Sequence, residues 1–350
     1  DVDALAAANT FWFALLILGL YLVARHLLDQ GWALLVAAIG AFTPVIFAAS
    51  RSFMPDFAAT AALVWAVYCL LHSGGFRDTG WVFLFALVTA IGLLIRPVSM
   101  LCCVGPVAAV VVAGAFECLR AEHGDEAGPG YRTLLLNVLL AAVVVAGLAA
   151  PWYLLELRQQ YTETAQAAAS SATTAAASVL PGGGPAELLG FLLVGALVVG
   201  ALRQYAQPTV QKAVAGAVVV IILVLLMLVK GQWAVFLLHL LNHGVLLPLF
   251  VLGAAGLAAV WFGGYAKLPL TVLALWLLSA YVLATLFSLE PTPHFLLPAV
   301  PVAVLFAVLG LRAVPAAGPR YVLAGAIVAW LGLQFVNLTV VACGPLARVE

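Results

Sequence analysis

Residues 51–72, RSFMPDFAATAALVWAVYCLLH, indicate the structural class of this protein. After a short charged beginning, residues 56–72 form an apolar run that can cross a bilayer, because a helix rises about 1.5 Å per residue. Similar runs recur along the whole chain, which is 66% hydrophobic and only 8% charged. The pattern predicts a polytopic all-α membrane protein, and the roughly ten-residue alternating segments of a membrane β-barrel do not appear.

The apolar runs predict about eleven or twelve transmembrane helices in one membrane domain that covers residues 1–350. Residues 155–185, which are rich in Ala, Ser and Thr, are expected to form an extracytoplasmic loop. No soluble domain fits between or after the spans. The expected spans are 10–28, 32–49, 56–72, 79–95, 98–116, 133–154, 186–202, 213–229, 244–262, 268–288, 295–313 and 321–342.

The basic residues predict the orientation of the chain, because cytoplasmic loops carry an excess of Lys and Arg. If the spans alternate in direction, one side of the membrane receives nine of the 14 basic residues, and we call it the basic-rich side. It carries Arg25, Arg77, Arg120, Arg132, Arg203, Lys212, Lys267, Arg312 and Arg320. The opposite, basic-poor side is expected to be extracytoplasmic, and it carries Arg51, Arg96, Arg158, Lys230 and Arg348.

The overall composition excludes several classes of function. The formal net charge is zero, which indicates neither a nucleic-acid partner nor a polybasic membrane patch. The five cysteines are scattered and mostly lie within apolar runs, so they fit no zinc or disulfide framework. His239 and His243 could share one helix face, but no acidic or cysteine partner stands beside them in the sequence. We therefore expect no metal site and no certain cofactor.

The basic-poor side gathers the residues on which a chemical function could depend. Pro55 suits the first position of a helix, and Asp56 then lies in the first turn, where the helix dipole favours a carboxylate. Arg96 precedes Pro97 in the same way, at the expected start of a helix whose free N–H groups suit an anion. Each charge could also be a simple interfacial cap at a span end. Further candidates on this side are Tyr153, Arg158, Glu290 and His294.

Four stretches resemble the membrane core of the GT-C glycosyltransferases. They are residues 20–71, AIGLLIRPVSML (90–101), APWYLLE (150–156) and PHFLLPAVPVAVLFA (293–307). The chain is most similar to the branch that includes the protein O-mannosyltransferases and the lipid A aminoarabinose transferase. The resemblance covers most of the chain in the same order.

The resemblance implies a site for a polyprenyl-phosphate sugar donor on the extracytoplasmic face of a membrane, and the bacterial inner membrane is the expected location. Asp56, Arg96 and His294 are the positions that match the family's site motifs, and Asp56 is the implied catalytic residue. Arg51 and Arg96 would bind the donor phosphate, because the forked donors of a guanidinium group suit phosphate. Membrane lipids and other membrane subunits are the expected partners.

The sequence also departs from the family pattern. The family's first extracytoplasmic loop, with its acidic motif, would lie ahead of the first span, where this chain offers only Asp1 and Asp3. We expect the family's N-terminal helix and first catalytic loop to be missing from this sequence. Two hypotheses stay open: a glycosyltransferase that uses a polyprenyl-phosphate sugar, or a non-catalytic scaffold subunit with a degenerate glycosyltransferase fold. A transporter is the third alternative, but no matched pair of interrupted spans supports it.

Overall fold

The computed structural model describes residues 2–51, 54–121, 131–170, 267–287, 293–314 and 317–343, with isolated positions between 231 and 256. Every regular element in this part of the chain is helical, which confirms the all-α prediction. The α-helices are α1 (Val2–Leu27), α2 (Gln30–Phe42), α3 (Pro44–Arg51), α4 (Pro55–His72), α5 (Thr79–Ile95), α6 (Pro97–Met100), α7 (Val104–Ala121), α8 (Tyr131–Ser170), α12 (Lys267–Phe287), α13 (Val300–Arg312) and α14 (Ala317–Cys343). Two 3₁₀-helices join them, η1 (Leu101–Cys103) and η2 (Pro293–Ala299).

The membrane spans follow the apolar runs of the sequence. Six described helical segments are long and apolar enough to cross a membrane, or seven if the bent pair of α2 and α3 is one span. The expected span 56–72 is α4, and the expected span 133–154 corresponds to Arg132–Leu155. The expected spans 186–202, 213–229 and 244–262 fall almost wholly outside the described residues. The predicted total of eleven or twelve therefore stays a prediction.

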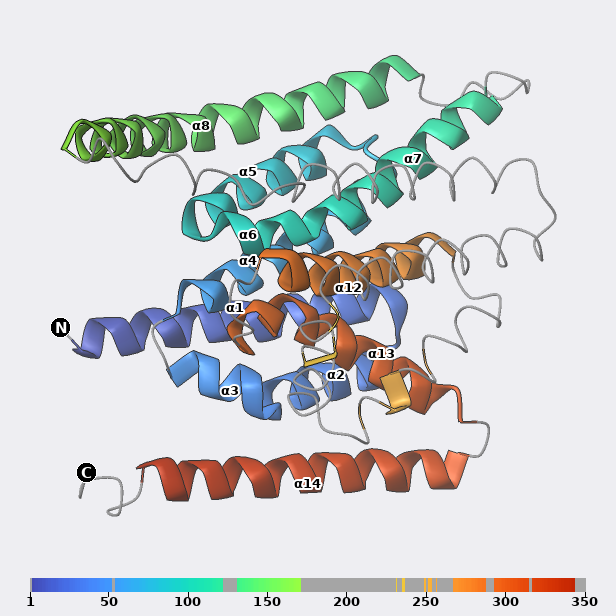
Figure 1. The fold of residues 1–350 in the computed structure, drawn as a ribbon. Helices are drawn as coiled ribbons and strands as arrows, with labels where there is room; N and C mark the ends of the chain where they lie inside the picture. The colour runs from blue at the N-terminus through green and yellow to red at the C-terminus, as the bar shows by residue number, and fades with distance from the viewer. Residues whose placement is uncertain are drawn as a thin grey trace.

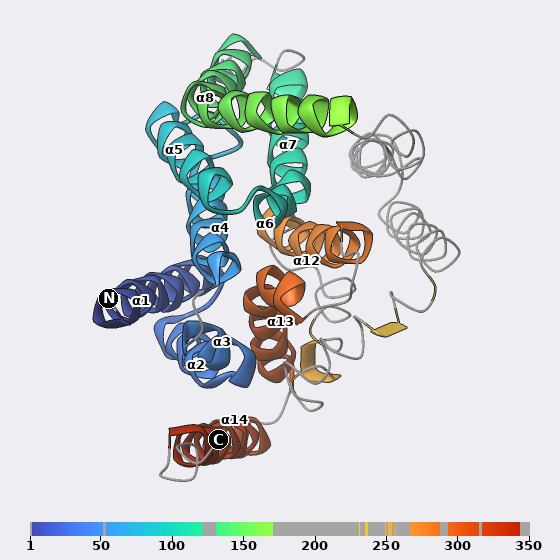
Figure 2. The same ribbon diagram turned by 60° about the vertical axis from the view of Figure 1, so that its left-hand side comes forward.

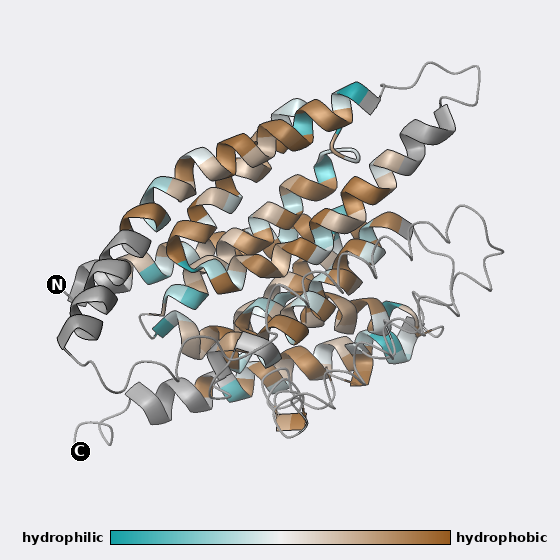
Figure 3. Ribbon diagram, turned by 45° about the horizontal axis from the view of Figure 1, so that its top comes forward, coloured by the Kyte–Doolittle hydropathy of each residue, from teal (hydrophilic) through white to brown (hydrophobic). Residues whose placement is uncertain are grey.

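The helices form a bundle in which α8 and α14 lie at opposite edges (Figures 1 and 2). The span Phe295–Arg312 is 83% buried and α4 is 72% buried, whereas the span in α8 is only 22% buried. Apolar residues also predominate on the outer helices (Figure 3), as expected for surfaces that face lipid. The helix α4 and the span Phe295–Arg312 are therefore central, and the start of each lies beside the candidate site described below.

The expected span 32–49 is bent at Thr43 and Pro44, where α2 and α3 meet at an angle of 55°. A residue before proline is driven out of the helical region, and Thr43 accordingly has φ −64° and ψ 123°. The Thr43 side chain is fully buried and donates a 2.7 Å hydrogen bond to the Ile39 carbonyl. The bend turns α3 so that it ends at Arg51, shortly before α4 begins.

The expected span 98–116 starts with two short helices instead of one continuous helix. The four-residue α6 and the 3₁₀-helix η1 come before α7. Ser279 of α12 donates a 2.7 Å hydrogen bond to the Cys102 carbonyl, which ties this irregular segment to the bundle. The helical segment that begins at Pro97 continues through η1 into α7, so the expected anion site at the helix start after Arg96 stays a prediction.

Glycines allow two close backbone approaches along α7. An added Cβ at Gly105 would lie 2.6 Å from the carbonyl oxygen of Leu275 in α12. At Gly114 an added Cβ would overlap the carbonyl oxygen of Gly75, which has φ +78° in the turn between α4 and α5. Small residues at such crossings let membrane helices pack closely.

Contacts at the basic-rich ends of the helices hold that side of the bundle together. Asp29 forms a 3.2 Å ion pair with Arg312. Asn137 of α8 donates hydrogen bonds to the carbonyls of Phe76 and Arg77 in the turn before α5. These contacts join helix ends that are distant in the sequence.

The helix α8 includes 40 residues, with Pro151 inside it, and it changes direction along its length (Figure 2). At about 1.5 Å per residue it is roughly twice as long as the hydrocarbon core is thick. The first part of the expected loop at 155–185 thus continues α8 as far as Ser170, and residues 171–185 lie outside the described part of the chain.

Candidate functional site

Asp56 lies in the first turn of α4, directly after Pro55, and its side chain faces the interior of the bundle. The residue is only 3% exposed, so Asp56 is not a solvent-exposed cap at a span end. Its own backbone carbonyl accepts a 2.7 Å hydrogen bond from the Thr60 hydroxyl. A carboxylate that is buried among apolar helices needs a cation or strong hydrogen-bond donors nearby, because its loss of water is costly.

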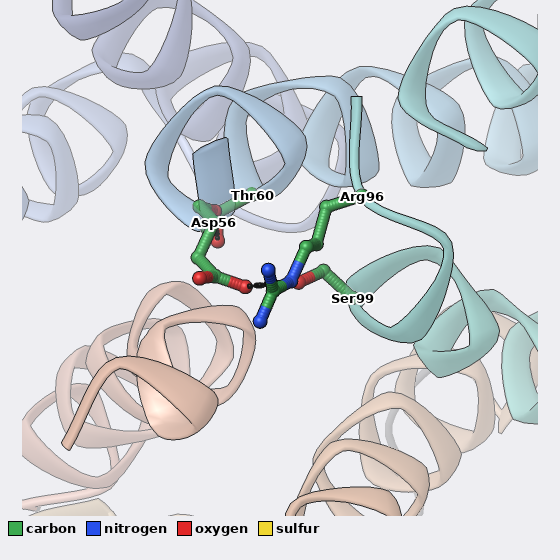
Figure 4. A network of polar contacts seen from close by, with 4 residues as sticks. All are labelled: Asp56, Thr60, Arg96 and Ser99. Carbon is green, nitrogen blue, oxygen red and sulfur yellow. Dashed lines mark hydrogen bonds and ion pairs between the residues drawn. The ribbon is translucent and has the colours of Figure 1, made fainter. Parts of the chain in front are cut away.

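Arg96 supplies that cation from the junction between α5 and α6 (Figure 4). Pro97 holds Arg96 in an extended conformation, with φ −157° and ψ 102°, and the Arg96 N–H still donates to the Gly92 carbonyl. The Arg96 Nε atom lies 3.1 Å from the Asp56 Oδ1 atom. The contact is an ion pair by distance, although its angle is not that of a straight hydrogen bond.

Ser99 completes the surroundings of the same carboxylate oxygen. Its hydroxyl donates a 3.0 Å hydrogen bond to Asp56 Oδ1, and the residue is only 5% exposed. Ser99 belongs to α6, one turn after Arg96, so a single short segment provides both partners of the carboxylate. The Asp56 charge is therefore compensated on one oxygen by a guanidinium and a hydroxyl group.

Phe295 brings the motif at 293–307 to this site. The centroid of its ring lies 5.9 Å from the Arg96 Cζ atom, within the range of a cation–π contact. Phe295 lies in η2, directly after His294, and the side chain of His294 lies outside the described part of the structure. The motif therefore reaches the site through the aromatic residue beside the predicted histidine.

Arg51 ends α3 at the same side of the bundle but is arranged differently. Its side chain is exposed, and its Cζ atom lies 5.0 Å from the ring centroid of Phe47 in the same helix. Asp56 of the RSFMPD stretch thus pairs with Arg96, which follows α5, and not with Arg51. Arg51 remains available as a second cation on the basic-poor side.

Tyr153 supports the site from α8. Its hydroxyl group donates a short hydrogen bond to the carbonyl of Leu93, in the last turn of α5. Because Arg96 directly follows α5, this contact fixes the backbone from which the Arg96 side chain extends. Tyr153 was predicted as a site residue, and it contacts the backbone near Arg96 rather than the charged side chains themselves.

Two other predicted residues, Glu290 and Arg158, have side chains outside the described part of the structure. Glu290 lies outside the described residues. Arg158 belongs to α8, but its side chain is not described. Within the described part of the chain, no three His, Cys, Asp or Glu side chains form a group suited to a metal ion.

Sequence analysis missed Ser99 and Phe295. Ser99 had a recognisable signal, because it follows Arg96 by three residues within a segment that begins with proline. Phe295 occupies the aromatic position beside His294 in the quoted motif. Neither signal identifies Asp56 as the common partner, since that requires the packing of α4 against α6 and η2.

The exposure of the three polar residues suggests what this arrangement can do chemically. Asp56 and Ser99 are buried, whereas the Arg96 side chain is 33% exposed. The 3.1 Å contact is made by Nε, the nitrogen nearest the aliphatic stem, rather than by a terminal nitrogen. A guanidinium group in this state can bind a further anion with its terminal nitrogens, and phosphate has the matching geometry.

Comparisons with known proteins agree with the resemblance seen in the sequence. Residues 3–123 match the family model described as dolichyl-phosphate-mannose-protein mannosyltransferase, and this range contains Asp56, Arg96 and Ser99. The match confirms the similarity to GT-C membrane glycosyltransferases over that part of the chain. The comparison with curated proteins found no match.

Among solved structures, the crystal structure of ArnT from Cupriavidus metallidurans in the apo state is similar to this chain. The alignment has 16% sequence identity and a TM-score of 0.45, and it covers 98% of this chain. It covers 49% of the ArnT chain, so this chain spans about half the length of that protein.

Proposed function

We propose that this protein transfers a sugar from a polyprenyl-phosphate-linked donor to an acceptor at the extracytoplasmic face of a membrane. The family match supports a GT-C glycosyltransferase in general terms. The description of that family names a dolichyl-phosphate mannose, which is a polyprenyl-phosphate sugar, and a protein as acceptor. The donor class, the membrane face and the bacterial inner membrane are parts of the proposal.

The observation that carries this proposal is the Asp56–Arg96 ion pair inside an apolar bundle. A charged pair is rare inside a membrane domain, and intramembrane charges commonly mark a functional site. The partly exposed guanidinium of Arg96 suits a phosphate that is still joined to a lipid. Arg51, which is exposed at the same side, is the second candidate for phosphate binding.

The apolar surface beside the site suits the lipid part of such a donor. Trp152, Leu154 and Leu155 are all exposed on α8, next to Tyr153. A polyprenyl chain can lie along these side chains within the hydrocarbon region, while its phosphate stays near the helix ends. The same surface also contacts ordinary membrane lipids.

The proposed reaction is a displacement at the anomeric carbon of the sugar. The acceptor oxygen forms a bond to that carbon, the bond from the carbon to the phosphate oxygen breaks, and polyprenyl phosphate leaves. Charge builds up on the leaving phosphate, where Arg96 would stabilise it. The acceptor proton goes to a base, and Asp56 is the sequence-based candidate for that base.

A transfer assay tests the proposal. The full-length protein, reconstituted in lipid nanodiscs, is supplied with radiolabelled polyprenyl-phosphate sugars, including the mannose form, together with a membrane extract as source of acceptors. We expect transfer by the wild type and a loss of at least about 100-fold in Arg96→Gln, the scale of one removed charge-stabilising donor.

Arg312→Gln is the matched control, because it also breaks an arginine–aspartate pair but at the opposite side of the bundle. It should retain transfer. If the wild type transfers no sugar from any donor while it remains folded, the proposal fails and the scaffold hypothesis is favoured. Co-purification with other membrane subunits would then be the next measurement.

A further inference from the structure

Asp56 is held by two groups that come from one segment of the chain. The Arg96 Nε atom and the Ser99 hydroxyl both lie close to Oδ1, at 3.1 and 3.0 Å. The two residues stand one helical turn apart, on either side of the bend that Pro97 imposes. Asp56 therefore joins the start of α4 to the junction between α5 and α6.

Asp56, Ser99 and Arg96 differ in how far their side chains are exposed to a ligand. The side chain of Asp56 is 4% exposed, whereas that of Arg96 is 33% exposed. A general base must come within hydrogen-bond reach of the acceptor proton. In this arrangement, Arg96 is the member of the group that a ligand can reach.

The guanidinium group of Arg96 is held from two directions. Asp56 lies at its Nε atom, and the Phe295 ring lies 5.9 Å from its Cζ atom. Because a guanidinium group is planar and rigid, contacts at Nε and at its centre also restrict where its terminal nitrogens point. Ser99 acts through Asp56, because its hydroxyl group donates to the same oxygen to which Nε is paired.

We propose that Asp56 and Ser99 are positioning residues, which hold the Arg96 guanidinium so that its terminal nitrogens bind the phosphate of the ligand. This inference rests on the proposed function, because it takes the ligand to be a polyprenyl phosphate. Ser99 is assigned a role that the sequence pattern did not predict. For Asp56, positioning is an alternative to the role of general base.

Substitutions at Ser99 test the proposal most directly. Ser99→Ala removes the hydroxyl group and leaves the charged pair in place, whereas Ser99→Thr retains a hydroxyl group. We would measure the Kd of a tritium-labelled polyprenyl monophosphate for the full-length protein in nanodiscs. Uncharged polyprenol of equal length is the reference ligand, since it shares the lipid chain and lacks the phosphate.

We expect Ser99→Ala to raise the Kd for polyprenyl monophosphate about 3- to 10-fold, part of the effect of losing a hydrogen bond to a charged group. Binding of polyprenol should be unchanged, and Ser99→Thr should restore the affinity for the phosphate. A general loss of folding would weaken both ligands and would lower the melting temperature, so these two measurements separate positioning from unfolding.

A chemical readout on Arg96 itself provides a second test. Phenylglyoxal forms adducts with guanidinium groups, and peptide mass spectrometry can locate the adduct on Arg96. Polyprenyl monophosphate should protect Arg96 in the wild type and in Ser99→Thr, and it should protect less in Ser99→Ala at the same ligand concentration.

Two negative outcomes have different meanings. If Ser99→Ala binds polyprenyl monophosphate as tightly as the wild type and protects Arg96 equally, the positioning role is wrong while the proposed function stands. If the wild type binds polyprenyl monophosphate no better than polyprenol, the assignment of a phosphate ligand is wrong in both proposals.

Discussion

Asp56 pairs with Arg96, which lies beyond the next membrane helix, whereas Arg51 of the same short stretch lies over the ring of Phe47. The pairing places the carboxylate inside the bundle and leaves Arg51 at its surface. It also connects the start of α4 with the junction of α5 and α6. The energetic and kinetic consequences of this one contact are measurable.

Asp56→Asn should lower the free energy of unfolding by about 1–3 kcal/mol, because Arg96 and Ser99 lose a charged partner in a buried place. The matched variant Asp29→Asn breaks a pair whose aspartate side chain is 62% exposed, and it should cost only about 0–1 kcal/mol. Thermal unfolding of both purified variants in the same detergent measures the difference. Equal losses would show that burial of Asp56 adds nothing to the strength of its pair.

Asp56→Asn also separates the two roles that remain for this carboxylate. If Asp56 positions Arg96, the variant should bind polyprenyl monophosphate more weakly, and a rise in donor concentration should recover much of the rate. If Asp56 is a general base, donor binding should persist and kcat should fall by roughly 10²–10⁴-fold. Steady-state transfer at several donor concentrations, with Kd measured separately, distinguishes these outcomes.

The orientation of the bundle can be tested with single cysteines at two exposed positions. The five native cysteines would first be replaced by serine, and a cysteine would then be placed at Arg51 or at Asp29. The basic-residue pattern predicts that a membrane-impermeant maleimide labels position 51 in intact cells. Position 29 should react only after the membrane is opened. The reverse pattern would move the site to the cytoplasmic face.

Gly105→Ala and Gly114→Ala should each destabilise the protein by about 1–3 kcal/mol, because the added methyl group meets backbone atoms that cannot move aside easily. Gly147→Ala is the control, since no heavy atom lies within 4 Å of an added Cβ there. Thermal unfolding of the three variants gives the comparison. A loss in Gly147→Ala as large as in the other two would contradict the role of close helix packing.

Much of the fold was predictable because membrane helices depend on local composition. The expected span 79–95 has the bounds of α5, and the expected span 56–72 differs from α4 by one residue. In lipid, every backbone group must find its partner within the segment, so a long apolar run becomes a helix. The bend at Thr43 and Pro44 is also a local effect of proline, but nothing local shows how far the helix turns.

The candidate site was predictable only in part. The sequence identified Asp56, Arg96 and Tyr153, because charged or polar residues beside prolines stand out at span ends. Their mutual arrangement was not predictable, since helices that are apolar on every side give no periodic pattern to show which face meets which neighbour. Ser99 and Phe295 gain their roles only through contacts with residues distant in the sequence.

The sequence by itself determined that this protein is an all-α membrane protein, where many of its spans lie, and which residues resemble those of GT-C glycosyltransferases. These properties depend on hydrophobicity and short motifs, which are local. Only the tertiary structure decided that Asp56 is buried, that Arg96 is its partner, and that Ser99 shares the same oxygen. The physical reason is that a charge inside an apolar bundle must find its partner across a helix interface, and side-chain packing alone determines that interface.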